Sequence, residues 1–174
     1  MIKFLTGAVF TLLMIPIFVF SYVKFGFAPV ATDAPALPFE RQLAHMGLNA
    51  QVDKDAPKVP PFQASKDDYL SAAHLYRQHC APCHGLPGEP KSAIAQGMYP
   101  KPPELFKGTG VTDDPAGESY WKIANGIRLS GMPAYKKTLS EKELWEISEL
   151  VANADKLPGE VTDALKKPLP IDVQ

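Results

Sequence analysis

The sequence has little of several features that often define a protein's class. It contains only two cysteines in 174 residues, and these lie three positions apart, so no disulfide framework can join distant loops. The net charge is -1, which argues against a nucleic-acid-binding surface. No internal repeat is present, and no segment alternates polar and apolar residues well enough to predict a strand. These absences favour one compact helical domain with accessory segments.

An uncharged, mostly apolar run of about twenty residues extends from Phe4 to Val23. A helix of this length can cross a hydrocarbon layer ~30 Å thick. The alternative is a cleaved signal peptide, but its apolar region usually spans only ~7–15 residues, and no good small-x-small cleavage site follows here. We therefore predict an uncleaved transmembrane anchor at residues 1–24. Lys3 and Lys24 bracket the run almost symmetrically, so charge alone does not orient it.

The eighteen prolines gather outside the periodic segments. Residues 25–64 are rich in Pro and Ala, which predicts a semi-extended tether. Within the tether, Glu40 to Asn49 can form one short amphipathic helix, which is either transient or a docking element for a partner. Residues 156–174 form a Pro- and Lys-containing tail, for which we predict no fold of its own.

Residues 65–155 carry the helical periodicity of a folded domain. Ser65 followed by Asp68 is close to a capping box, and it predicts the start of a first helix. That helix has an inward face that ends at the cysteines: Tyr69, Ala72, Ala73, Tyr76 and Cys80.

The second half of this domain contains two more helices. Residues 85–114 are rich in Gly and Pro and predict an ordered loop rather than a strand. A short helix is expected at residues 117–125, ended by Gly126. Ser140 with Glu143 opens a last helix, and Pro158 with Gly159 stops it. Its apolar stripe is Leu144, Ile147, Leu150, Val151 and Ala154.

Both cysteines belong to the segment Cys80-Ala81-Pro82-Cys83-His84, which is the C-x-x-C-H pattern of covalent haem attachment. Two thiols at this spacing can each form a thioether with one vinyl group of a haem, and the histidine that follows is then held beneath the iron. A thioredoxin-like pair would normally follow a strand, whereas a helix precedes this one. A zinc site would need a second pair of ligands, and none has suitable spacing. Haem attachment also predicts that the domain lies in the periplasm.

The sixth ligand of the iron decides between electron transfer and ligand binding or catalysis. No histidine follows His84, so the candidates in the later sequence are Met98 and Met132. Met132 lies in a loop between two predicted helices, where the chain can fold across the opposite haem face. Met98 follows the proximal ligand more closely, and we expect it to fill space in the core or at the haem edge. The earlier histidines, His45, His74 and His79, leave bis-histidine ligation as the minority interpretation.

Taken together, these residues resemble a monohaem class I c-type cytochrome of the bacterial membrane-anchored kind. The resemblance covers residues 65–155 and is carried by four motifs: "CAPCH", "KPPELF", "GIRLSGMPAY" and "LSEKELWEISELVANA". It implies an all-α, cytochrome c-like fold around one covalent haem c, preceded by a single transmembrane helix. At the crossing of the first and last helices, the family often has Gly against an aromatic residue, whereas this chain has Ala72 and Leu150.

The resemblance also implies roles for individual residues. Cys80 and Cys83 would form the thioethers, with His84 and Met132 as axial ligands. The carbonyl of Pro103 would accept a hydrogen bond from the outer N–H of His84. Two further side chains would pack on the porphyrin: Tyr76 and Leu105.

A haem with His and Met ligands favours one-electron transfer rather than enzymatic catalysis. We therefore expect a carrier, not an enzyme, at the periplasmic side of the inner membrane. The partners would be a quinol-oxidising complex, a dehydrogenase or a terminal oxidase, and the mixed charges of the domain do not choose among them. If Met132 does not bind iron, a gas sensor or a peroxidase-like protein is the alternative. A structural subunit whose haem serves folding is a third hypothesis.

Overall fold

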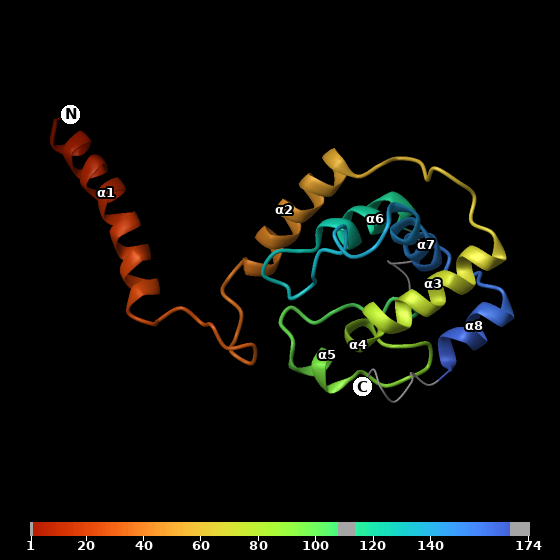
Figure 1. Ribbon diagram of the computed structural model, residues 1–174. Helices are drawn as coiled ribbons and strands as arrows, with labels where there is room; N and C mark the ends of the chain where they lie inside the picture. The colour runs from red at the N-terminus through yellow and green to blue at the C-terminus, as the bar shows by residue number, and fades with distance from the viewer. Residues whose placement is uncertain (1, 108–113, 168–174) are drawn as a thin grey trace. The chain divides into compact units, whose positions relative to one another are not determined.

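The computed structural model describes residues 2–107 and 114–167. Within these ranges the chain is helical and has no strand, apart from one isolated bridge between Ile127 and Met132. The chain divides into two compact units, residues 1–41 and 42–174. The helices in the described ranges are α1 (Ile2–Lys24), α2 (Glu40–Asp55), α3 (Lys66–His79), α4 (Ala81–His84), α5 (Ala93–Gly97), α6 (Ala116–Asn125), α7 (Glu141–Ala152) and α8 (Gly159–Lys166) (Figure 1). The all-helical fold agrees with the prediction.

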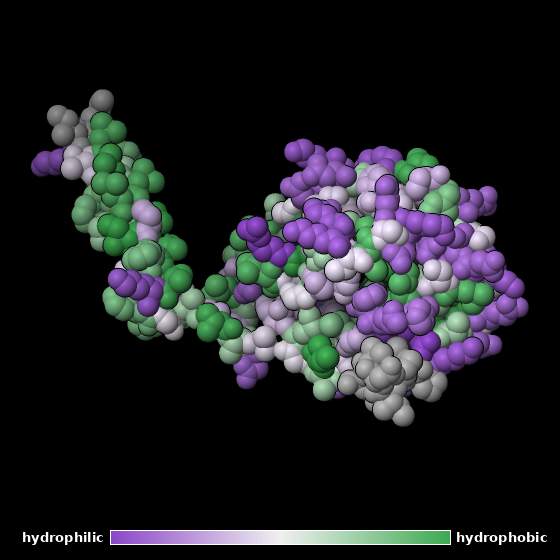
Figure 2. Space-filling view, viewed as in Figure 1, coloured by the Kyte–Doolittle hydropathy of each residue, from purple (hydrophilic) through white to green (hydrophobic). Residues whose placement is uncertain are grey.

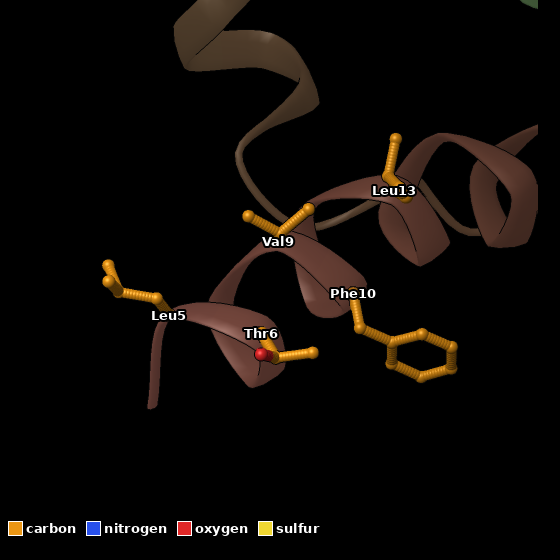
Figure 3. Close-up of a pocket in the computed structure, with 5 residues that line it drawn as sticks. All are labelled: Leu5, Thr6, Val9, Phe10 and Leu13. Carbon is orange, nitrogen blue, oxygen red and sulfur yellow. The ribbon is translucent and has the colours of Figure 1, made fainter. Parts of the chain in front are cut away.

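Helix α1 dominates the first unit. Residues Lys3–Lys24 are long and apolar enough to cross a membrane, and no part of this segment is buried against the rest of the chain. A signal sequence near the N-terminus can meet the same criteria of length and apolar composition. The visible surface of α1 is mostly apolar, with polar groups near its two ends, whereas polar residues cover much of the visible face of the second unit (Figure 2). In Figure 3 the side chains of one stretch project outward from the helix: Leu5, Thr6, Val9, Phe10 and Leu13.

Local sequence signals fix the ends of the main helices of the second unit. Ser65 caps α3, and its hydroxyl accepts a hydrogen bond from the backbone N–H of Asp68. Ser140 and Glu143 do the same for α7, and both pairs are complete capping boxes. Gly126, with φ of 67°, ends α6. These three predicted boundaries are confirmed. The predicted stop of the last helix at Pro158 and Gly159 is wrong, because α7 already ends at Ala152 and these two residues begin α8.

The core of the second unit lies where α3 packs against α7 and α8, and where α6 packs against α7. Ala72 and Leu150, the residues expected at the crossing of the first and last helices, are both fully buried. From the predicted stripe of α7, Leu144, Ile147 and Val151 are buried as well, while Ala154 lies beyond the helix end and is half-buried. Tyr120 of α6 stacks on the buried ring of Trp145, with 4.3 Å between the ring centroids.

Polar contacts fix α3 against α7 along their solvent-facing edge. The Ser71 hydroxyl donates to the carboxylate of Glu146 at 2.7 Å, and Glu146 is only 2% exposed. Lys142 bridges Glu146 and Asp68, with 2.6 Å between its ammonium nitrogen and the Asp68 carboxylate. A carboxylate this buried is stable only with such partners. The polar bridge therefore holds the two helices in register.

The prediction that the tail has no fold is wrong for residues 159–166. These residues form α8, and Val161 and Leu165 are fully buried against the core that contains α3. The two residues are four positions apart, so they share one helix face and give this short segment an apolar stripe. An ion pair of 2.9 Å between Lys66 and Glu160 adds an exposed contact. Of the remaining tail residues, 168–174 lie outside the described residues.

The segment predicted as a tether is also more structured than its composition suggests. The short helix expected at residues 40–49 runs on to Asp55. Val52 is 1% exposed and Ala56 is 7% exposed, so the end of α2 belongs to the core of the second unit. Apolar burial at two positions outweighs the weak helix signal of a polar, Gly-containing segment.

Candidate haem site

The C-x-x-C-H segment forms the junction between two helices. Cys80 ends α3 by donating its backbone N–H to the Tyr76 carbonyl, and it also begins the single turn of α4. The backbone N–H of His84 then donates to the Cys80 carbonyl at 2.8 Å. Both thiols are free and partly buried. One helical turn therefore presents the two thiols and the imidazole as a single rigid group.

The His84 ring is held by a second segment of the chain. Its Nδ1 lies 2.8 Å from the carbonyl oxygen of Pro103, and a carbonyl can only accept, so Nδ1 carries the hydrogen. This bond leaves Nε2 as the nitrogen that can bind a metal. Burial lowers the pKa of His84, and the hydrogen bond to Pro103 opposes that shift. The ring is therefore oriented and kept neutral, as an axial ligand must be.

The thiol of Cys80 differs from that of a redox-active pair. Burial, with a smaller contribution from Cys83, raises the pKa of Cys80 to about 12. Thioredoxin-like enzymes need a thiolate and lower this pKa instead. The environment of Cys80 therefore argues against thiol–disulfide exchange.

Tyr76 supports the turn that follows the histidine. Its ring is fully buried, and its hydroxyl donates to the carbonyl of Gly85 at 2.9 Å. Phe106 meets this ring edge-on, with centroids 4.9 Å apart. Tyr76 thus connects the end of α4 to the segment that contains Pro103 and Leu105. The sequence suggested packing on a porphyrin but not this hydrogen bond.

The segment after His84 is fixed to α4 by a polar contact. The hydroxyl of Ser92, which caps α5, also lies 2.5 Å from the carbonyl of Pro82 in the cysteine motif. Ala95 on α5 is buried. These contacts explain how a stretch rich in Gly and Pro becomes an ordered support, as predicted, although it also contains the short helix α5. Residues 108–113 of the predicted loop lie outside the described residues.

Met132 lies in a short loop between α6 and α7. Its carbonyl accepts from the N–H of Ile127 at 3.2 Å, and the loop is also closed by the Ser130 hydroxyl, which donates to the Ile127 carbonyl at 2.7 Å. After Met132, the backbone N–H groups of Tyr135 and Lys136 donate to carbonyls in the last turn of α6. Met132 is partly buried against the hydrophobic core.

Two glycines and a second methionine shape this loop. A Cβ added at Gly126 would lie 2.7 Å from the carbonyl oxygen of Met132, so only glycine allows the loop to cross so closely. A Cβ added at Gly131 would lie 2.9 Å from the terminal methyl carbon of Met98. Met98 therefore packs beside the Met132 loop, although it comes from the segment that supports His84. Sequence reasoning did not find the close approach at Gly126.

The three earlier histidines are exposed: His45 on α2, and His74 and His79 on α3. None lies in the buried cluster. His79 has a structural contact, because the hydroxyl of Tyr135 donates to its backbone carbonyl at 2.8 Å. Through Tyr135, the Met132 loop is joined to the end of α3, beside the cysteines.

The residues present fit a covalently attached haem. Cys80, Leu105 and Met132 pack on the same core while remaining only partly buried. His84 is partly buried and oriented by Pro103, whose own side chain is exposed. Side chains of this kind offer apolar contact area around the thiols and the imidazole. Their individual roles toward haem remain predictions.

Comparison with known families identifies the class of protein. Residues 67–151 match the family model described as "Cytochrome C oxidase, cbb3-type, subunit III". This range runs from the first turn of α3 to the penultimate residue of α7 and includes both the cysteine motif and the Met132 loop. Residues 67–151 therefore form a c-type cytochrome domain, and a domain of this class binds haem c and transfers electrons.

Two further comparisons complete this description. The chain is similar to a component of the "Kuenenia stuttgartiensis reducing HAO-like protein complex Kustc0457/Kustc0458", with 21% sequence identity and a TM-score of 0.48. That similarity covers 56% of this chain and 48% of the other, so the chain spans about half the length of that structure. No curated protein sequence matches the chain.

Proposed function

We propose that this chain is a membrane-anchored monohaem cytochrome c that carries single electrons between redox proteins of the membrane or the periplasm. It acts as a free carrier or as a subunit of a respiratory complex, and not as an enzyme. The observation that carries this proposal is the hydrogen bond from His84 Nδ1 to the Pro103 carbonyl, in a domain whose loop presents Met132.

Each side chain of the site has a separate task. Cys80 and Cys83 hold the haem edge by thioether bonds, and the bound haem supplies one-electron redox chemistry. His84 would bind the haem iron through Nε2, and the Pro103 carbonyl keeps its ring from rotating. Met132 would bind the iron through its thioether, which would raise the reduction potential. With both residues bound, the iron would have no position left for substrate.

The anchor restricts where the electrons go. With α1 uncleaved, the haem domain stays at the membrane surface, and Lys3 lies on the cytoplasmic side. The length and apolar character of Lys3–Lys24 support this arrangement. A quinol-oxidising complex or a dehydrogenase would then deliver electrons, and a terminal oxidase or a periplasmic protein would accept them.

The proposal is tested on the intact protein purified in mild detergent. Mass spectrometry of the denatured chain should give the mass of the uncleaved polypeptide plus one haem. The reduced protein should bind carbon monoxide poorly, because Met132 holds the sixth position. Tight carbon monoxide binding by the untreated reduced protein would favour the ligand-binding alternative instead. Affinity purification through the anchor would then identify the partners.

A further inference from the structure

Helix α2 has apolar side chains on two opposite faces. Successive residues of an α-helix are rotated by roughly 100°, so Leu43, Met46 and Ala50 share one face, here called the outer face. Leu48 and Val52 lie on the other side of the helix, the inner face. A helix of a globular domain normally has one apolar face. Two such faces mean that the helix has two different surroundings.

The inner face belongs to the cytochrome domain. Val52 is 1% exposed, and Ala56 just after the helix is buried as well. The next residue, Pro57, packs so closely on α6 that a Cβ added at Gly117 would lie 1.7 Å from its carbonyl oxygen. These contacts fix the end of α2 and therefore the direction of its outer face.

The outer face has large apolar side chains in contact with solvent. Leu43 is 65% exposed and Met46 is 67% exposed. The segment between α1 and α2 has the same character, with five exposed large apolar residues: Phe25, Phe27, Val30, Leu37 and Phe39. Exposed apolar residues thus continue along the chain from α1 to α2. Such continuity is uncommon on a surface that faces only water.

We propose, on the basis of the membrane anchor in the proposed function, that the outer face of α2 lies in the surface of the bilayer that holds α1. The fifteen residues from 25 to 39 span at most roughly 50 Å, so α2 is always within reach of that surface. Because the anchor holds α2 at a high effective concentration near the bilayer, a few apolar side chains suffice for this contact. The domain then presents one fixed side to the membrane and does not swing freely.

Lipid suits this face better than a protein partner does. The aligned side chains are aliphatic or thioether groups, which enter hydrocarbon but offer no hydrogen bond for specific recognition. The charges of α2 are mixed and slightly acidic, with Glu40, Asp53 and Asp55 against Arg41 and Lys54. The contact therefore depends on apolar insertion and not on anionic lipids.

The test uses the full-length holoprotein in phosphatidylcholine nanodiscs. A spin label is attached at Leu43→Cys, and a matched label at His45→Cys, which is also exposed but lies roughly 200° around the helix. The collision rate of each spin label with oxygen, which concentrates in lipid, is compared with its collision rate with a water-soluble nickel chelate. At residue 43 we expect the ratio of oxygen to nickel accessibility to be several-fold higher than at residue 45.

Three results would overturn the proposal in distinguishable ways. Failure of the protein to migrate with nanodiscs would remove the anchor and this contact together. Migration with nanodiscs but equal nickel accessibility at both labels would leave the anchor intact and exclude lipid contact. A label at residue 43 that is accessible to nickel in nanodiscs but immobile in native membranes would assign the face to a protein partner.

Discussion

The two sides of the proposed haem site are built by different physical means. The proximal side consists of one helical turn after α3, in which main-chain bonds fix Cys80 and His84, and the Pro103 carbonyl fixes the ring. The distal side is a loop, in which Met132 is placed by a glycine crossing and a few hydrogen bonds to α6. The first arrangement lies in a helical turn and is fixed by main-chain bonds and by a bond to Pro103. The second lies in a loop that is held by a few contacts to the end of α6, so it should be easier to change without losing the fold.

The largest expected effect separates the two sides directly. His84→Ala removes the proximal ligand, and metal coordination is coupled to folding, so the yield of haem-containing protein should fall by roughly tenfold or more. Met132→Ala should keep nearly normal yield and covalent haem. Haem absorbance per polypeptide measures both variants. Equal losses in the two variants would contradict the difference between the sides.

The second prediction concerns the helix that supports the proximal side. Leu165 of α8 is fully buried in the core that contains α3, so Leu165→Ala should lower the free energy of unfolding by about 2–5 kcal/mol. Asp163→Ala on the same helix is the control, because Asp163 is exposed, and its effect should stay within about 0.5 kcal/mol. Denaturant unfolding of the holoprotein gives both values. Similar values would mean that α8 is not part of the cooperative domain.

The third prediction concerns the distal loop alone. Gly126 and Gly88 have φ of 67° and 81°, so an alanine at either position should cost about 1–2 kcal/mol of backbone strain. At Gly126 the new Cβ would also meet the backbone of Met132, Pro133 and Ala134, whereas at Gly88 it would meet nothing within 4 Å. Only Gly126→Ala should therefore lower the reduction potential. A redox titration of both variants provides the comparison, and a normal potential in Gly126→Ala would show that the crossing does not position the ligand.

The smallest expected effect lies away from the haem. Hydrogen bonds from Lys142 and Ser65 hold the pKa of Asp68 well below its usual range. The ionised Asp68 carboxylate therefore stabilises the folded state fully above its unfolded pKa of about 3.9. This stabilisation is lost as the pH falls from that value through the lower pKa of the folded state. Asp68→Asn should cost less than about 1 kcal/mol near neutral pH, because the pair is partly exposed. The free energies of unfolding of the two proteins, taken from denaturant curves, should converge at acidic pH. A difference that stays constant with pH would exclude stabilisation by the ionised Asp68 carboxylate.

Much of this structure could be predicted from sequence because its signals are local. The capping residues Ser65 and Ser140, the stop at Gly126 and the C-x-x-C-H pattern each act within a few residues. The helical fold, the starts of α3 and α7 and the end of α6 followed from them. The hydrogen bond between His84 and Pro103, expected from the family resemblance, is also present.

The rest depends on contacts between distant segments. Nothing within residues 159–166 indicates that Val161 and Leu165 have a core to bury against. In the same way, Gly117 gives no sign that Pro57 packs on it. Met98 beside Gly131 is a third case, because a methionine after the proximal histidine fits many positions. Composition predicted unstructured segments at residues 25–64 and 156–174, because it gives only the average apolarity of a segment. It does not show whether two apolar residues lie on the same helix face.

The central claim is that His84 and Met132 bind one covalently attached haem iron from opposite faces. The most direct test is the absorption spectrum of the oxidised holoprotein, in which thioether ligation gives a weak charge-transfer band. The account predicts this band in the native protein and its loss in Met132→Ala, with the potential falling by on the order of 0.1 V, a fraction of the about 0.8 V that axial ligands span. A native protein without the band, or a variant that keeps it, would contradict the assignment of Met132.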